Sequence, residues 1–410
     1  MKLWIRYGVG IGLGLVLGMF MSPDSVNGTG GIVFLAELAL NIGRYTVIPL
    51  LFFLIPVSIF TLLEERKLLR VAGKTAGYIG AAAAAGVAIG GLMVIVLSPQ
   101  RIPIIMAETA APEIPGLTDI LLQVFPANAA EIFGAGGAYL LPAAVLATLL
   151  GFGFARSHSF SEPVLDFFDS AARLMYTLTG WIVSITGVLL IALTTRLVLQ
   201  LRSISEIGLF SEVLFAVFFS AGLVLLIGIP LAVFLLAKGH SPVQFLFAIL
   251  PPVLAAGISG SHVFSLTTLM RTGRNNQGVS RKAESVVFGM TTLLCRAGTA
   301  MVSMIVFIVV LRSYSSLEIS LLRIAAVGGS TLLLSFLLGN IPGGNLLIFL
   351  ALLSSLHGRG IPDSYLILLP LVPVLSRIGV ALDIAVAAAI AQIVGIQEHA
   401  CKSVAPHDFI

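Results

Sequence analysis

The sequence predicts an all-α polytopic membrane protein with eight transmembrane helices and two re-entrant helical hairpins. The chain of 410 residues is 58% hydrophobic and only 10% charged. Its mean hydropathy of +1.07 lies far outside the range of soluble globular proteins. Basic residues gather in short connections between long uncharged stretches, and two later hydrophobic segments are interrupted by small and polar residues.

Six hydrophobic stretches in the first part of the chain are long enough to cross a hydrocarbon layer of about 30 Å as helices. They lie at about 7–22, 38–62, 76–98, 137–155, 168–199 and 208–237. The first stretch follows a basic N-terminus, as in a signal peptide, but it is long and has no obvious small-residue cleavage site. We therefore expect it to be the first membrane span.

Basic residues in short loops predict the orientation of these spans. Lys2 and Arg6 precede the first span, whereas the loop of residues 22–31 contains no Lys or Arg. Four basic residues separate the second span from the third: Arg66, Lys67, Arg70 and Lys74. Because positive charges collect on the cytoplasmic side, we expect a cytoplasmic N-terminus in the cell (inner) membrane. The same alternation places Lys238 and His240 inside.

After residue 240 the apolar stretches become shorter. Residues 245–256 and 263–270 flank a turn of small residues at 257–261, and neither stretch is long enough to span the membrane. Irregular backbone at membrane depth is tolerated only where it is buried in protein or lines a wet cavity. We therefore expect a re-entrant hairpin, with a tip that contains Ser259, Gly260, Ser261 and His262.

A second interruption follows the same plan. Residues 332–338 and 346–353 flank a turn, and the expected tip contains Ile341, Pro342, Gly343 and Gly344. An apolar helix follows each hairpin, at about 286–312 and 364–395. Paired interrupted segments of this kind indicate a transporter's binding site near the midplane of the membrane. The alternative is coincidence among the many Gly and Ser residues.

Each hairpin tip is followed by an arginine at the same offset. Residues 261 and 296 are 35 positions apart, and so are residues 342 and 377. Arg296 and Arg377 lie in apolar segments, where a charge costs about 2.5–3.5 kcal/mol on insertion scales and indicates a functional site by default. Guanidinium groups and helix N-termini suit carboxylate or phosphate. Together the two arginines could hold an anion; alternatively, each forms a structural ion pair or extends toward the membrane surface.

Two further titratable residues lie near these arginines. Asp383 follows Arg377 by six positions and is the one acid within the last apolar helix. It could pair with an arginine, carry a proton or act as a simple structural partner. His262 could titrate near neutral pH and so support proton coupling, or it could be a solvated residue of the hairpin tip.

The sequence contains no P-loop, no nucleophile and base pair, and no His/Cys/Asp cluster with metal-ligand spacing. Its two cysteines, Cys295 and Cys401, do not suggest a disulfide framework. We therefore expect no enzymatic activity, no cofactor, no metal site, no nucleic-acid partner and no ATP-driven transport.

Motifs distributed along nearly the whole chain indicate a known family. Ile-Pro-Leu-Leu-Phe-Phe at 48–53 and Val-Phe-Pro-Ala-Asn at 124–128 are similar to that family's second helix and its P-x-N connection. Residues 257–261 occupy the place of its serine-rich first hairpin tip, and residues 341–344 resemble the Val-Pro-Gly-Ala-Gly stretch of the second. The chain thus resembles the glutamate-transporter family, the dicarboxylate/amino acid:cation symporters.

The resemblance implies an elevator-type transporter with inverted repeats that assembles as a homotrimer in the lipid bilayer. A static scaffold would comprise residues 1–66 (helices 1 and 2) and 117–202 (helices 4 and 5). A mobile transport domain would comprise residues 67–102 (helix 3) and 203–398 (helix 6, hairpin 1, helix 7, hairpin 2 and helix 8).

The chain departs from the family where coupling cations would bind. The family's Asn-Met-Asp-Gly-Thr in helix 7 is replaced by Cys-Arg-Ala-Gly-Thr at 295–299, so only Gly298 and Thr299 remain. Residues 81–85 are five alanines where the family has hydroxyl ligands. Four polar positions of helix 8 fall at Arg377, Val380, Ile384 and Ala388. Because sodium needs hard oxygen ligands, we do not expect the usual sodium coupling; the coupling cation, Na⁺ or H⁺, stays open.

Arg377 stands where the family has the acid that receives the substrate's amino group, and Val380 replaces the arginine expected one turn later. Positions three apart share a helix face, so the anion-binding arginine could have moved by one turn. We expect a symporter of a small anionic solute, dicarboxylate-like or amino-acid-like, with anions that lack an amino group preferred. The alternatives are a cation-independent facilitator or channel, and an intramembrane sensor or enzyme.

Overall fold

The computed structural model describes residues 2–22, 30–103, 117–133, 139–156, 158–204, 207–237, 241–314, 319–339, 341, 345–358, 362–402 and 404–410. Within these ranges the secondary structure is helical, apart from one isolated β-bridge between Val279 and Cys401. The α-helices are α1 (Leu3–Phe20), α2 (Gly31–Arg44), α3 (Val47–Glu64), α4 (Leu68–Leu97), α5 (Leu117–Val124), α6 (Leu141–Arg156), α7 (His158–Arg202), α8 (Ser211–Leu223), α9 (Ile229–Leu236), α10 (Pro242–Ser259), α11 (His262–Asn275), α12 (Arg281–Leu294), α13 (Ala297–Ser313), α14 (Leu321–Leu338), α15 (Leu346–His357) and α16 (Val372–Gln397).

Short segments of other helical types interrupt or extend these α-helices. A π-helical turn, η4 (Val224–Gly228), joins α8 to α9. The 3-10 segments are η2 (Ala129–Phe133), η3 (Ile207–Phe210), η5 (Pro362–Leu371) and η6 (Pro406–Asp408). The span predicted at 364–395 is therefore a 3-10 segment that continues into α16, and the span predicted at 208–237 contains a π-helical turn.

Nine helical segments in the described ranges are long and apolar enough to cross a membrane. They include the predicted first, second, third, fifth and sixth spans, whereas the fourth corresponds to α6, which has only 16 residues. They also include α10 and α14, each of 18 residues. The chain is therefore a multi-pass membrane protein.

The arms of the hairpins are longer than hydropathy predicts. The sequence suggested that neither arm of the first hairpin could span the membrane, and this is wrong for α10. The hydroxyl of Ser241 caps α10 by accepting a hydrogen bond from the backbone N–H of Gln244, and Pro242 occupies the first turn. These residues add a turn that the apolar pattern alone does not reveal.

Two predicted helices are divided in the structure. The predicted span at 38–62 is divided between α2 and α3 by a turn at Tyr45 and Thr46. The predicted helix at 286–312 is divided between α12 and α13 at Cys295 and Arg296, where the backbone leaves the helical conformation and Cys295 is extended. The continuous helix expected there is therefore wrong, because hydropathy does not detect a backbone break that is buried in protein.

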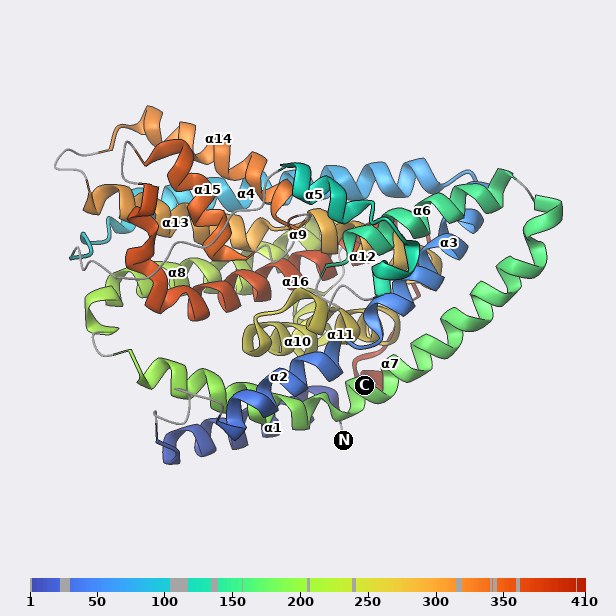
Figure 1. Cartoon of the computed structure of the whole chain (residues 1–410), viewed down its shortest axis with the longest axis horizontal. Coiled ribbons are helices and arrows are strands. Elements are labelled where there is room, and N and C mark those ends of the chain that lie inside the picture. The colour runs from blue at the N-terminus through green and yellow to red at the C-terminus, as the bar shows by residue number, and fades with distance from the viewer. Residues whose placement is uncertain are drawn as a thin grey trace.

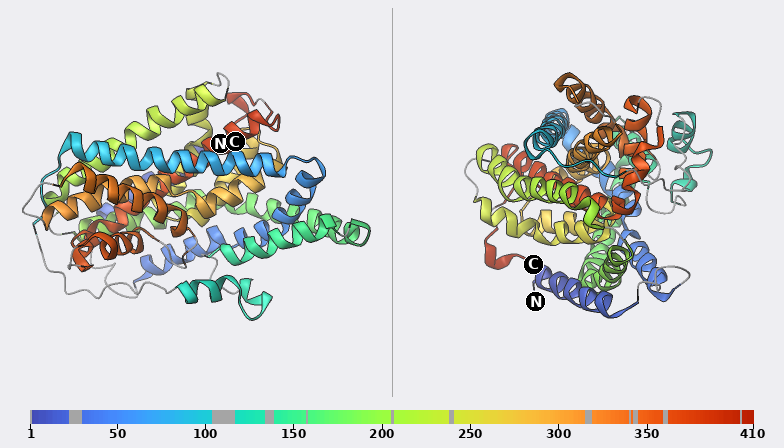
Figure 2. Two further views of the ribbon diagram at one scale, coloured as in Figure 1. Left: turned by 90° about the horizontal axis from the view of Figure 1, so that it is seen from above. Right: turned by 90° about the vertical axis from the view of Figure 1, so that its left-hand side faces the viewer.

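The helices form two groups. The long α7 packs against α1 and α2 over one part of its length and against α3 over another, and α6 packs on α3 (Figure 1). On the other side, α4 packs on α13, and α13 packs on α16. The hairpin of α10 and α11 lies between the groups and contacts both α7 and α16 (Figure 1). The chain termini lie close together in all three views (Figures 1 and 2).

Candidate substrate site at the hairpin tips

The break between α12 and α13 exposes the N-terminus of a helix inside the protein. The first backbone N–H groups of such a helix have no intrahelical partner. One carboxylate oxygen of Asp383, on α16, accepts hydrogen bonds from the backbone N–H groups of Gly298 (2.7 Å) and Thr299 (3.2 Å). Its other oxygen accepts one from the Thr299 hydroxyl at 2.6 Å. Asp383 therefore caps α13 across a helix-helix contact, and its negative charge suits that helix end.

The contact between α13 and α16 is close at this point. A β-carbon added to Gly298 would lie 2.2 Å from the β-carbon of Leu382 and 2.7 Å from the carbonyl oxygen of Gly379. Because no side chain fits, glycine at 298 allows the start of α13 to approach α16 closely enough for the Asp383 cap. The Gly-Thr pair that the sequence retains is thus explained by packing and capping.

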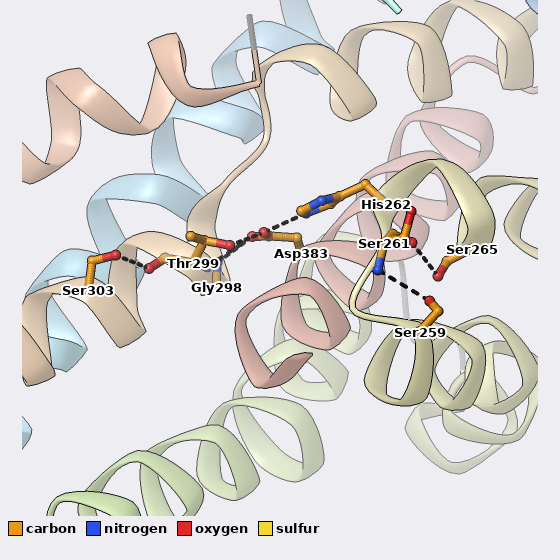
Figure 3. Close-up of polar contacts among 8 residues, drawn as sticks. All are labelled: Ser259, Ser261, His262, Ser265, Gly298, Thr299, Ser303 and Asp383. Carbon is orange, nitrogen blue, oxygen red and sulfur yellow. Dashed lines mark hydrogen bonds and ion pairs between the residues drawn. The ribbon is translucent and has the colours of Figure 1, made fainter. Parts of the chain in front are cut away.

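The first hairpin tip reaches the same carboxylate. Gly260 ends α10 in the left-handed conformation, with φ of 64°, and the Ser261 side chain caps α11 by accepting a hydrogen bond from Phe264 N–H at 3.3 Å. This places His262 so that its Nε2 lies 2.9 Å from the Oδ2 of Asp383 (Figure 3). His262 is therefore paired, and the alternative of a solvated tip histidine is wrong.

Serine hydroxyls form local hydrogen bonds with the two backbone segments that meet at Asp383. The Ser259 hydroxyl accepts a hydrogen bond from the Ser261 N–H (3.2 Å), and the Ser265 hydroxyl donates to the Ser261 carbonyl (2.9 Å) (Figure 3). On α13 the Ser303 hydroxyl donates to the Thr299 carbonyl at 2.8 Å. Local hydrogen bonds thus hold the tip and the helix start in place.

Arg296 lies at the break itself and is unusually placed. Its side chain is buried, with 7% of the residue exposed. Its charge interacts with that of Asp383 and acts on His262. Among the described residues, however, its Nε and Nη1 atoms have no hydrogen-bond partner. A buried guanidinium with unsatisfied donors is energetically costly unless an acceptor is supplied.

The second hairpin approaches the same arginine. A β-carbon on Gly339, which follows α14, would lie 2.1 Å from the Leu293 carbonyl oxygen and 3.2 Å from the Nη2 of Arg296. The end of α14 therefore lies directly beside the break. Sequence reasoning missed Gly339, although a glycine at the first position of the interruption was a usable signal. Of the predicted second tip, only Ile341 is described; Pro342, Gly343 and Gly344 lie outside the described residues.

Arg377 has different surroundings. Its Nε donates to the carbonyl of Ile258 at the end of α10 (2.9 Å), and its Nη1 donates to the carbonyl of Pro373 (2.6 Å). The charge of Arg196 on α7 also acts on it. Val380, one turn later, is buried in the apolar core. Arg377 thus binds a carbonyl at the C-terminal end of α10, an arrangement that the helix dipole favours.

A separate, apolar cavity adjoins α13. Its volume is about 300 Å³, and it is bounded by α4, by the α8–α9 segment with its π-helical turn, by α13 and by α16. Residues from the alanine run, Ala81, Ala82 and Ala85, form one wall, and Val386 and Ala389 form part of another. These are the helices on which the family resemblance places cation ligands, and their side chains here supply almost no oxygen.

The structure therefore brings most of the predicted residues together, but not all in one role. The residues around the Asp383 carboxylate come from α10, α11, α13 and the connections before α11 and α13: Ser259, Gly260, Ser261, His262, Arg296, Gly298 and Thr299. Arg377 instead donates to the carbonyls of Ile258 and Pro373, and Val380 is buried in the apolar core.

A model of the sodium:dicarboxylate symporter family matches residues 3–396, almost the whole chain. The match includes α1 through most of α16 and therefore all of the residues that surround Asp383. Among curated proteins, no sequence matches the chain.

Proposed function

Because the chain belongs to the sodium:dicarboxylate symporter family, we propose that it is a secondary transporter of a small organic anion, with Arg296 as the anion ligand. One observation carries the proposal: two buried guanidinium nitrogens of Arg296 have no hydrogen-bond partner among the described residues. A carboxylate can accept two parallel N–H donors from one guanidinium group. Such a substrate would satisfy these donors and offset the buried charge.

The position of Arg296 suits a site that opens and closes. The first hairpin tip reaches it through the pair of His262 and Asp383, whose Nε2 and Oδ2 atoms lie 2.9 Å apart. Gly339, at the end of the first arm of the second hairpin, lies beside it. Binding sites in transporters of this general plan lie near the midplane, between such interrupted segments. A solute held by Arg296 would therefore lie between the two hairpins.

We propose that α13 and α16 move with both hairpins against a scaffold, in an elevator movement. The mobile part would contain residues 67–102 and 203–398, and the scaffold residues 1–66 and 117–202, in a homotrimer. The packing supports this division, since α1, α2 and α3 pack against α7, whereas α4 and α16 pack against α13. The N-terminus would lie on the cytoplasmic side of the cell membrane.

Sodium coupling of the usual kind is not part of this proposal. The helices that should supply cation ligands line an apolar cavity, with Ala297 and Met301 among its residues. Both oxygens of Asp383 already accept hydrogen bonds from Gly298, Thr299 and His262. The linked His262 and Asp383 side chains make a proton the favoured coupling ion. A cation-independent facilitator is the second candidate, and the apolar cavity favours it.

Uptake into proteoliposomes tests these statements. We expect saturable uptake of a carboxylate that lacks an amino group, with an imposed proton gradient stimulating uptake and a sodium gradient leaving it unchanged. Uptake that no cation gradient alters would favour the facilitator. If the protein takes up only α-amino acids and ignores carboxylates, the assignment of the substrate class is wrong. Stimulation by a sodium gradient would overturn the coupling assignment.

A further inference from the structure

A second cavity lies away from Arg296, between the scaffold helices and the first hairpin. Its volume is about 830 Å³, and α3, α7, α11 and the start of α12 form its walls. Five basic side chains line it: Arg173, Arg271, Arg274, Arg281 and Lys282. Only two acids, Asp166 and Asp169, share the lining.

The ion pairs in this cavity leave part of its positive charge uncompensated. Asp169 is shared by Arg173, at 2.8 Å, and Arg281, at 3.0 Å. Lys282 pairs with Glu65 outside the cavity at 2.9 Å. Within the part of the chain that the structure describes, neither Arg271 nor Arg274 lies within ion-pair distance of an acid, although the buried Glu284 interacts electrostatically with Arg274 and Arg281. The guanidinium of Arg274 lies over the ring of Tyr176, with its central carbon 5.0 Å from the ring centroid.

Arg271 is held at the boundary between the two groups of helices. A β-carbon added to Gly180 of α7 would lie 1.9 Å from the Nη1 of Arg271 and 3.0 Å from its Cζ. The guanidinium therefore lies directly on the α7 backbone, and a side chain at position 180 would have to displace it. Arg271 and Arg274 both belong to α11 of the first hairpin. They therefore line the wall of the cavity that lies opposite α7.

The cavity lies at the end of the bundle where basic connections gather. Lys282 reaches the loop between α3 and α4 through Glu65, and Arg66 and Lys67 belong to that loop. The positive-inside rule assigns this end to the cytoplasmic membrane surface, where anionic headgroups are present and basic pockets between helices bind them. Apolar lining residues, Val57 and Leu165, adjoin the charges and suit acyl chains.

We propose that this cavity binds the phosphate headgroup of an anionic phospholipid, with Arg271 and Arg274 as the phosphate ligands. Guanidinium groups match phosphate oxygens through paired hydrogen bonds. A phosphate bound here would join α7 to α11 and add the counter-charge that the cavity lacks. Binding at this position does not depend on which solute the protein moves or on Arg296.

Thermal unfolding of the purified full-length protein in a neutral detergent tests the proposal. We expect phosphatidylglycerol to raise the Tm by several degrees, since a ligand that binds only the folded state stabilises it by mass action. Phosphatidylcholine with the same acyl chains, and sodium phosphate without lipid, should leave the Tm unchanged. Equal protection by phosphatidylcholine, or by inorganic phosphate alone, would overturn the assignment to an anionic lipid.

Two double variants distinguish lipid binding in the cavity from a general attraction to the positive charge of this surface. Arg271→Gln with Arg274→Gln should weaken phosphatidylglycerol binding roughly tenfold or more, because the charged hydrogen bonds to the phosphate are lost. Arg66→Gln with Arg70→Gln removes the same charge outside the cavity and should leave the affinity unchanged. An equal loss in both variants would show diffuse attraction and refute the site. Native mass spectrometry of retained lipid gives the same comparison if the first variant is less stable.

Discussion

Arg296 and Arg377 follow the two hairpin tips at the same sequence offset, yet their guanidinium groups have different partners. Arg377 donates to two backbone carbonyls, those of Ile258 and Pro373. Arg296 has two buried nitrogens without a hydrogen-bond partner in the described structure, and Asp383, the acid whose charge acts on it, already caps a helix. An arginine with satisfied donors stabilises the fold, whereas one with unsatisfied donors destabilises it and is available for a ligand.

The largest effect should come from removing the acid beside Arg296. Asp383→Ala leaves the N–H groups of Gly298 and Thr299 and the charge of Arg296 without their buried partner. We expect the protein to lose about 3–5 kcal/mol of stability, as when one member of a buried charged network is removed. The Tm of the purified protein measures this loss. Glu131→Ala, at an exposed acid of η2, is the control; an equal loss there would mean that the cap is unimportant.

Replacement of Arg296 should separate function from stability. Arg296→Met removes the proposed anion ligand, and we expect substrate affinity to fall by about 2–4 kcal/mol, or roughly thirtyfold to several hundredfold. The empty protein should lose little stability, because unsatisfied donors are removed from the interior while Asp383 keeps its hydrogen bonds from Gly298, Thr299 and His262. Isothermal titration and thermal unfolding measure the two quantities. A variant that loses stability but keeps its affinity would contradict the assigned role.

The same replacement at Arg377 should have the opposite pattern. Arg377→Met breaks the hydrogen bonds to Ile258 and Pro373 and leaves the end of α10 less well held. We expect a loss of about 1–3 kcal/mol of stability, together with a smaller change in substrate affinity than at Arg296. Thermal unfolding of both methionine variants, measured side by side, checks the contrast. If Arg377→Met abolishes binding without changing the Tm, Arg377 is the anion ligand and the comparison is reversed.

The sequence predicted much of the fold because hydropathy and small-residue interruptions are local signals. It located the hairpin tip at Gly260 and the family's Gly298 and Thr299. It could not distinguish Arg296 from Arg377, because an offset of 35 residues fixes a position along each unit but not which neighbours face the side chain. The partner that distinguishes them, Asp383, lies 87 positions after Arg296 and meets it only through the packing of α16 on α13.

The charged lining of the second cavity was only partly predictable. Arg271, Arg274 and Arg281 lie close together in the sequence around the connection that follows the first hairpin, a pattern that favours the cytoplasmic membrane face. Asp169 and Arg173 were not singled out, although they lie within a predicted span and form an i, i+4 ion pair. A charged pair inside an apolar helix is a signal that sequence reasoning could have used.

The smallest effect concerns an ion pair outside the membrane, which gives a baseline for the buried charges. Lys282 and Lys67 lower the pKa of the Glu65 carboxyl, with the hydrogen bond from Lys282 as the main cause. A lowered pKa in the folded state means that the stabilisation is present above the unfolded-state pKa of about 4.3 and is lost as the pH falls below it.

Because the Glu65 side chain is 36% exposed, we expect this ion pair to contribute only a few tenths of a kcal/mol to the free energy of unfolding. The Tm difference between wild type and Glu65→Gln should therefore be small at pH 7, should shrink in high salt and should disappear only when the pH has fallen below the lowered pKa of the folded state. A larger Tm difference that persists in high salt would show that the pair between α3 and α12 stabilises the fold as much as the contact of Asp383 between α13 and α16 does.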